Sequence, residues 1–257
     1  MPREQERLAI SPHRAYRRLP FVKPWSLGLS LLLLLGLEAV LLIFLADIAR
    51  LFSQVAFHLV PEMGATVRQG DDRFLGVPLS PLLFSVPPMT YQTVFLWVIG
   101  SLGSLLLLLK VPWIAPPFRI LLIYNLFLIG ATAVYLLFAG HLGYEAEDFS
   151  RLYLRTIVIV WLVLPVFMGG LSMTLPFSPL EQLGYVVCAL LYNFLFSAVR
   201  YALFIWVIWK LGVVMMADLY LFFGPLMDFI YSVGIFTFFL MRLTRRLDRQ
   251  VERWTWL

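Results

Sequence analysis

Two ionisable residues, Arg200 and Asp228, lie inside long apolar stretches of this 257-residue chain. A guanidinium in hydrocarbon costs about 2.5 to 3.5 kcal/mol on insertion scales, so such residues usually face a protein interior, a cavity or a partner. An arginine in that position can neutralise a carboxylate or stabilise an oxyanion, with Ser150 or Asp228 assisting. Arg200, Asp228 and Ser150 are therefore the candidate catalytic residues of the chain.

The remaining nucleophiles and metal-ligating side chains are few. Cys188 is the single cysteine, which excludes an intramolecular disulfide and a cysteine-cluster metal site. It precedes Arg200 by twelve residues, about 18 Å along a helix and about 120 degrees around it, so the two do not share a site. We expect Cys188 to be a small buried hydrophobe.

The histidines give only a weak catalytic pattern. His141 precedes Ser150 by nine residues, so a Ser–His pair is conceivable. Histidines in loops more often have no catalytic role, and this is the interpretation that we favour for His58 and His141. No His or carboxylate spacing repeats on one helix face, so we expect no metal site, no haem and no other cofactor.

Composition identifies the class of protein that must position these residues. Apolar residues make up 61% of the chain and charged residues 14%, against about 45 to 50% and about 25% in soluble domains. The Lys and Arg residues gather at the two ends, beside hydrophobic segments, and not in a patch suited to nucleic acid. We therefore predict a polytopic, all-α membrane protein whose surroundings are the lipid bilayer, with no nucleic-acid partner.

A transmembrane helix needs about 20 mostly apolar residues. Six segments meet this requirement, namely residues 25–46, 91–109, 120–138, 153–173, 183–209 and 219–241. Because both tails are rich in arginine, the positive-inside rule places both termini in the cytoplasm, which an even number of spans allows.

The predicted organisation follows from these spans. Residues 1–24 and 242–257 are basic cytoplasmic tails, and residues 25–241 form the transmembrane bundle. Residues 52–90 form an outer loop whose Gly, Pro and Asp content favours turns over long helices. Small residues should let helices approach closely; these are Gly100, Ser101, Gly103, Ser104, Gly169 and Gly170. Gly224 and Pro225 should kink the last span.

Several charged residues are predicted to lie at similar depths in the membrane. At about 1.5 Å per residue, Arg200 and Asp228 each lie roughly 13 Å from the outer ends of neighbouring antiparallel spans. Glu38 and Arg155 fall in the same half of the membrane. We predict an outer-leaflet polar cluster of Arg200, Asp228, Glu38 and Arg155, which serves either as a structural ion-pair network or as a working site.

Two short motifs in the last third suggest a family. SAVR, residues 197–200, and FFGPLMDFIYSVG, residues 222–234, lie in neighbouring spans. They resemble the Asn-x-x-Arg element and the histidine-bearing segment of the exosortase and archaeosortase family of multi-span sorting enzymes. The resemblance covers roughly residues 149–240.

The chain departs from that family at its catalytic residues. Asp228 or Phe229 stands where the family has histidine, and the cysteine position falls near Phe149 or Ser150. The resemblance therefore implies a scaffold that keeps Arg200 without cysteine-based cleavage. It points to a non-catalytic accessory protein of a bacterial inner membrane, working beside another integral membrane protein in envelope protein sorting or exopolysaccharide export. A membrane enzyme with altered chemistry and a transporter or channel subunit are the alternatives.

Overall fold

The computed structural model describes residues 17–18, 24–60, 67–110, 114–248 and 255–256. It confirms the predicted fold class, an all-α bundle with six helical segments long and apolar enough to span a membrane. The helices are α1 (Pro24–His58), α2 (Tyr91–Lys110), α3 (Pro116–Ala139), α4 (Ala146–Met173), α5 (Pro179–Leu211), the 3-10 turn η3 (Val213–Met215), α6 (Met216–Leu221) and α7 (Pro225–Asp248).

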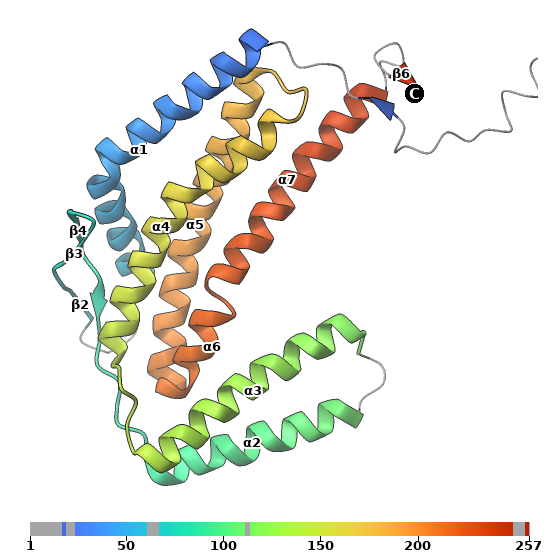
Figure 1. Ribbon diagram of the computed structural model, residues 1–257. Coiled ribbons are helices and arrows are strands. Elements are labelled where there is room, and N and C mark those ends of the chain that lie inside the picture. Colours follow the sequence, from blue (N-terminus) through green and yellow to red (C-terminus); the bar gives the residue numbers. More distant parts are fainter. Residues whose placement is uncertain (1–16, 19–23, 61–66, 111–113, 249–254, 257) are drawn as a thin grey trace, which may run out of the picture.

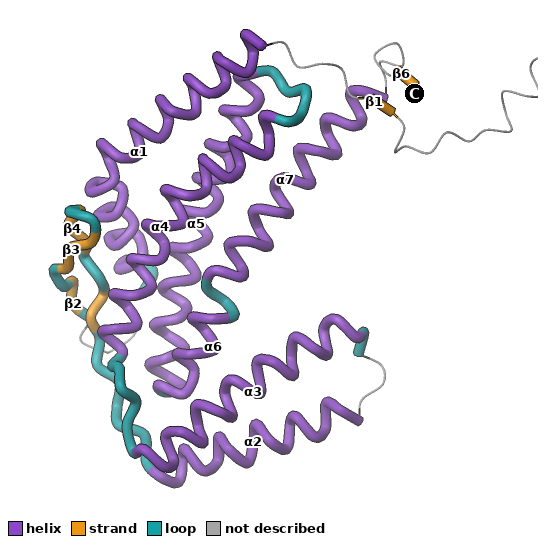
Figure 2. Tube along the Cα trace, in the orientation of Figure 1, coloured by secondary structure: helices purple, strands orange, loops and turns teal. Residues whose placement is uncertain are grey.

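The helices form a main bundle and a separate hairpin (Figure 1). Helices α1, α4 and α5 pack along one another, and α7 runs beside α5. Helices α2 and α3 pair as a hairpin that diverges from the bundle and meets it through η3 and α6. The start of α1 and the end of α7 lie at one end of the molecule, here called the tail end; residues 67–90 lie at the other, the loop end (Figure 2).

Two helices continue beyond their predicted ends. Helix α1 runs to His58 and not to residue 46, because Ala49, Phe52 and Ala56 repeat at helical spacing and are fully buried. Its 35 residues span about 52 Å, more than the hydrocarbon thickness. The predicted loop 52–90 therefore begins inside a helix. Helix α7 likewise continues to Asp248, so the predicted tail 242–257 begins inside its last turns.

The loop end contains short strands where we expected turns alone. Strand β2 (Arg68–Gln69) pairs with β5 (Leu82–Leu83), and β3 (Asp72–Phe74) pairs with β4 (Val77–Leu79), both antiparallel. Leu75 and Gly76, with φ of 51° and 81°, form the two-residue turn between β3 and β4, and positive φ at both positions is typical of a type I′ hairpin. At the opposite, tail end of the molecule, β1 (Arg17–Arg18) pairs with β6 (Thr255–Trp256), also antiparallel (Figure 2).

Buried apolar side chains form one cluster toward each end of the main bundle. The cluster at the loop end joins α1, α4 and α5 to loop residues Leu79, Leu82 and Phe84. The cluster toward the tail end joins Leu34 of α1 to α4 and α5. The loop is thus part of the core, which fixes its position over α4 and α5.

The small residues behave only partly as predicted. A Cβ on Gly169 would lie 2.6 Å from the Leu34 side chain, so this glycine does allow α4 and α1 to approach closely. Ser101 is buried and packs against Gly130 of α3. The prediction was wrong for three other glycines, which have nothing within 4 Å of the Cβ position, and Ser104 is exposed. Those three are Gly100, Gly103 and Gly170.

Candidate functional site

A break in the sixth span brings Asp228 to face α5. The chain leaves the helix after Leu221 and starts a new one at Pro225, whose ring fits the first turn of a helix because its missing N–H is not needed there. Gly224 is required at the break, since a Cβ there would lie 2.2 Å from the Tyr220 carbonyl oxygen. As predicted, Gly224 and Pro225 interrupt this span, and Asp228 lies in the first turn of α7.

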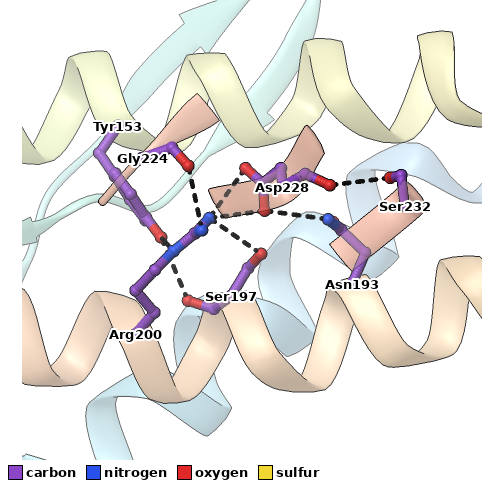
Figure 3. Close-up of polar contacts among 7 residues, drawn as sticks. All are labelled: Tyr153, Asn193, Ser197, Arg200, Gly224, Asp228 and Ser232. Carbon is purple, nitrogen blue, oxygen red and sulfur yellow. Dashed lines mark hydrogen bonds and ion pairs between the residues drawn. The ribbon is translucent and has the colours of Figure 1, made fainter. Parts of the chain in front are cut away.

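Every nitrogen of the Arg200 guanidinium, which extends from α5, donates at least one hydrogen bond (Figure 3). Nε donates to the Tyr153 hydroxyl at 2.8 Å, and Nη1 donates to the Gly224 carbonyl at 3.1 Å. Nη2 donates to the Asp228 carboxylate at 2.8 and 2.9 Å, and to Ser197 Oγ at 3.3 Å. The predicted ion pair between Arg200 and Asp228 is therefore present.

Asp228 has further partners of its own. Asn193 Nδ2 donates to Asp228 Oδ1 at 3.1 Å, and Ser232 Oγ donates to the Asp228 backbone carbonyl at 2.8 Å (Figure 3). Both charges are buried, with Arg200 4% and Asp228 5% exposed. Such a pair is tolerated in a low-dielectric interior only when its remaining donors and acceptors are also satisfied.

Aromatic rings enclose the pair on one side. The Arg200 guanidinium carbon lies 5.7 Å from the ring centroid of Tyr153 and 6.0 Å from that of Phe204. Tyr153 also donates through its hydroxyl to the Ser197 carbonyl at 3.4 Å, and its ring stacks on Tyr201 at 5.0 Å. The cation is thus flanked by two aromatic rings, and its charge is neutralised by Asp228.

Arg155 does not join this cluster, contrary to our prediction. It forms a bidentate pair with Asp72 of β3, with Nε and Nη2 at 3.0 and 2.9 Å from the carboxylate oxygens. The physical reason is helix geometry, because Tyr153 faces Arg200 and a residue two positions later points about 200 degrees away around α4. The hydrogen bonds from Arg155 hold the pKa of Asp72 below its ordinary value.

Glu38 is also absent from the cluster. Counted from the tail end, Glu38 lies about 21 Å along α1 and Arg200 about 32 Å along α5, so roughly 10 Å of depth separates them. Glu38 is half-buried, and its Oε2 atom has no hydrogen-bond partner among the described residues. The sequence predicts Glu38 in the same half of the membrane as Arg200 because the first span is expected to end at residue 46, whereas α1 runs to His58.

Ser150 anchors the loop to the bundle and is not placed as a nucleophile. Its Oγ donates to the Leu82 carbonyl at 2.6 Å and is hydrogen-bonded to the Tyr201 hydroxyl, which accepts from the Leu82 N–H at 3.0 Å. Ser150 and Tyr201 are fully buried. His141 is exposed and lies against the Leu142 carbonyl, so the conceivable Ser–His pair is not formed.

The other candidates stay apart from the Arg200 site. Cys188 is exposed on the outside of α5, so our prediction of a buried cysteine was wrong, because its face of the helix has no neighbouring helix. His58 lies 2.8 Å from the Gln54 carbonyl at the end of α1. Within the described part of the chain, no three His, Cys, Asp or Glu side chains gather closely enough to hold a metal ion.

Sequence reasoning missed several members of the site. Asn193, Ser197 and Arg200 follow one another at spacings of four and three, which is one face of a helix, so this polar stripe on α5 was open to detection. Tyr153 belongs to another span, and nothing in its local sequence distinguishes it from the other tyrosines of the chain. Gly224 contributes through its backbone, which residue type does not reveal.

Comparisons with protein-family models, with curated proteins and with solved structures found no match to this chain.

Proposed function

We propose that this chain is a non-catalytic accessory subunit that folds around the Arg200–Asp228 pair and associates with another integral membrane protein. The observation that supports a structural role for the pair is the number of partners that it has within the bundle. All three guanidinium nitrogens have partners, and both carboxylate oxygens of Asp228 accept from Arg200. A group that stabilises a reacting oxyanion needs a donor aimed at the place where the charge develops.

The position of the pockets supports the same interpretation. One pocket of about 600 Å³ lies at the loop end, between residues 84–89, the α2–α3 hairpin and the start of α4. Another of about 920 Å³ lies at the tail end between α5 and α7. Neither of these two pockets of the described residues is lined by Arg200 or Asp228, so a substrate in either one would not contact the pair.

The α2–α3 hairpin is the surface that we assign to the partner. It diverges from the main bundle (Figure 1), and large apolar side chains are exposed along both of its helices. Examples are Leu96, Leu107, Phe118 and Phe127. Apolar contact alone does not drive helix association in lipid, where packing and interhelical hydrogen bonds do. Hairpin residue Asn125 is half-buried, and its Nδ2 donates to the Leu121 carbonyl at 2.9 Å; the rest of its amide is a polar group that such a contact can use.

The biological setting that we propose follows from the family resemblance. The arginine element at Ser197 and Arg200 resembles that of exosortases, while the catalytic cysteine and histidine of that family have no counterpart in this chain. We therefore propose envelope protein sorting or exopolysaccharide export in a bacterial inner membrane as the setting, with the sorting enzyme as the partner.

Site-specific photo-crosslinking in native membranes tests this proposal. We expect p-benzoylphenylalanine in place of Phe127 of α3 to form an adduct with one integral membrane protein, and the same probe in place of Leu32 of α1 to label lipid. Both positions are exposed and apolar, so they form a matched pair. Absence of a protein adduct from the hairpin, with purification as a lone species at native expression levels, would refute the proposal.

A further inference from the structure

The tail-end pocket between α5 and α7 is basic at its rim. Its lining includes Arg242, Arg245 and Arg246 from the last turns of α7, opposite Glu181 in the first turn of α5. With a volume of about 920 Å³ it is large enough for the headgroup and upper chain of a lipid.

Among the described residues, only part of this charge is neutralised. Arg246 pairs with Glu181 at 2.5 Å and donates to the Pro176 carbonyl at 3.3 Å. Arg242 and Arg245 are exposed, and neither forms an ion pair with another described residue. Glu181 is the single acidic residue in the lining, so three cations face one anion and the pocket has a net positive charge.

The same pocket is apolar on the side toward the bundle centre. Phe238 and Phe239 of α7 line it there, and Phe238 is 57% exposed; Phe177 lines the pocket from the connector just before α5. The arginines follow Met241, where the apolar run of α7 ends, so they lie at the boundary between hydrocarbon and headgroups. A basic pocket between helices at that depth, with aromatic walls below it, complements a phosphate with an acyl chain.

We propose that this pocket binds one anionic phospholipid, with its phosphate between Arg242 and Arg245 and an acyl chain along Phe238. Arg246 is the positioning residue, because its pair with Glu181 ties the end of α7 to the start of α5 and so keeps the two walls together. The lipid then fills a space that the described side chains leave open at the tail end.

Native mass spectrometry of the full chain in detergent tests the proposal with phosphatidylglycerol and phosphatidylcholine as the added lipids. We expect one phosphatidylglycerol to bind in preference to phosphatidylcholine. Arg242→Gln/Arg245→Gln should weaken that binding about 30-fold, since each cation near a headgroup contributes about a fivefold change. Lys110→Gln/Arg119→Gln removes two cations from the α2–α3 hairpin and should bind as the unaltered chain does.

Equal binding of the two lipids, or unchanged phosphatidylglycerol binding in Arg242→Gln/Arg245→Gln, would overturn the proposal. Displacement of the lipid by millimolar inorganic phosphate would also overturn it, because the site would then take a free anion. If the glutamine variant does not fold, Arg242→Lys/Arg245→Lys serves instead; it keeps the charge and should retain the preference for phosphatidylglycerol, and loss of that preference in a folded lysine variant would contradict the assignment.

Discussion

At the scale of single residues, the Arg200–Asp228 pair is stabilised by the hydrogen bonds that neighbouring groups make to both ions, although the nearby Asn193 Oδ1 atom has no partner among the described residues. Moving two charges into a low-dielectric interior costs several kcal/mol per ion, and their attraction repays this only with good geometry and satisfied neighbours. Tyr153, Ser197 and the Gly224 carbonyl supply the missing partners for Arg200. Removal of either ion alone would therefore leave an uncompensated charge in the bundle.

The Tyr201 hydroxyl should also stabilise the fold, although it touches no ion. It accepts from the Leu82 N–H and bonds to Ser150, so Tyr201→Phe leaves both groups buried without it. We expect the free energy of unfolding in mixed micelles to fall by about 1 to 3 kcal/mol.

Tyr135→Phe is the matched control, because Tyr135 is 54% exposed on α3. We expect this variant to unfold as the unaltered chain does. If Tyr201→Phe were equally harmless, the Leu82 N–H and Ser150 would have other partners and the loop would not be anchored through this hydroxyl.

Prediction of single contacts succeeded where both partners lie in adjacent spans, and it failed where one partner lies in a loop or is a buried hydrogen-bonding group. The Arg200–Asp228 pair was predictable, because two opposite charges in adjacent apolar spans each need a counter-ion. The partner of Arg155 was not, because Asp72 lies 83 positions away in a loop whose path over α4 is set by packing. Ser150 appeared as a candidate nucleophile because its residue type says nothing about its buried hydrogen bonds.

At the scale of elements, the break between α6 and α7 decides where Asp228 and the Gly224 carbonyl lie. The Cβ of Gly224→Ala would fall 2.2 Å from the Tyr220 carbonyl oxygen, a backbone atom that cannot move aside as a side chain would. We expect this variant to lose about 1 to 3 kcal/mol of unfolding free energy, the usual cost of overpacking, and to loosen the hydrogen bond from Arg200. Unfolding in mixed micelles measures the loss.

Gly234→Ala, in the same helix, is the control for helix propensity. Nothing lies within 4 Å of its Cβ position, so alanine there should be neutral or stabilising by up to about 1 kcal/mol. Equal stability of the two alanine variants would show that the break tolerates a Cβ and that our account of Gly224 is wrong.

The elements themselves were largely predictable, and their ends were not. Six apolar runs of sufficient length predict six spans, because lipid requires each crossing segment to satisfy its own backbone. The end of α1 was missed because Asp47 and Arg50 look like a boundary, whereas Phe52 and Ala56 continue the buried face to His58. The strand pairs of the loop were missed because two- and three-residue strands have no detectable periodicity.

At the scale of the whole molecule, the two ends of the membrane-spanning part lie at the same end of the structure. The start of α1 and the end of α7 share the tail end, as an even number of spans requires (Figure 1). The direction of insertion is a separate prediction that comes from the arginine-rich tails and the positive-inside rule. It places the strands of residues 67–90 outside the cytoplasm.

Cysteine labelling in intact cells tests that direction. In a Cys188→Ser background, Gln69→Cys in strand β2 should react with a membrane-impermeant maleimide, because residue 69 is exposed at the loop end. Lys110→Cys at the end of α2 should react only after the membrane is permeabilised. The reverse pattern would mean that the tails lie outside and that the basic pocket faces the other leaflet.

The most direct test of the central claim is the unfolding free energy of four proteins in one mixed-micelle titration: the unaltered chain, Arg200→Met, Asp228→Leu and the double variant. We predict that each single variant loses about 3 to 5 kcal/mol, because it leaves one buried charge unpaired. The double variant should lose clearly less than the sum of the two single losses, since it leaves no unpaired charge in the bundle, although Tyr153, Asn193 and the Gly224 carbonyl still lose their partners. Losses that simply add in the double variant would contradict the claim that Arg200 and Asp228 stabilise the fold by neutralising each other.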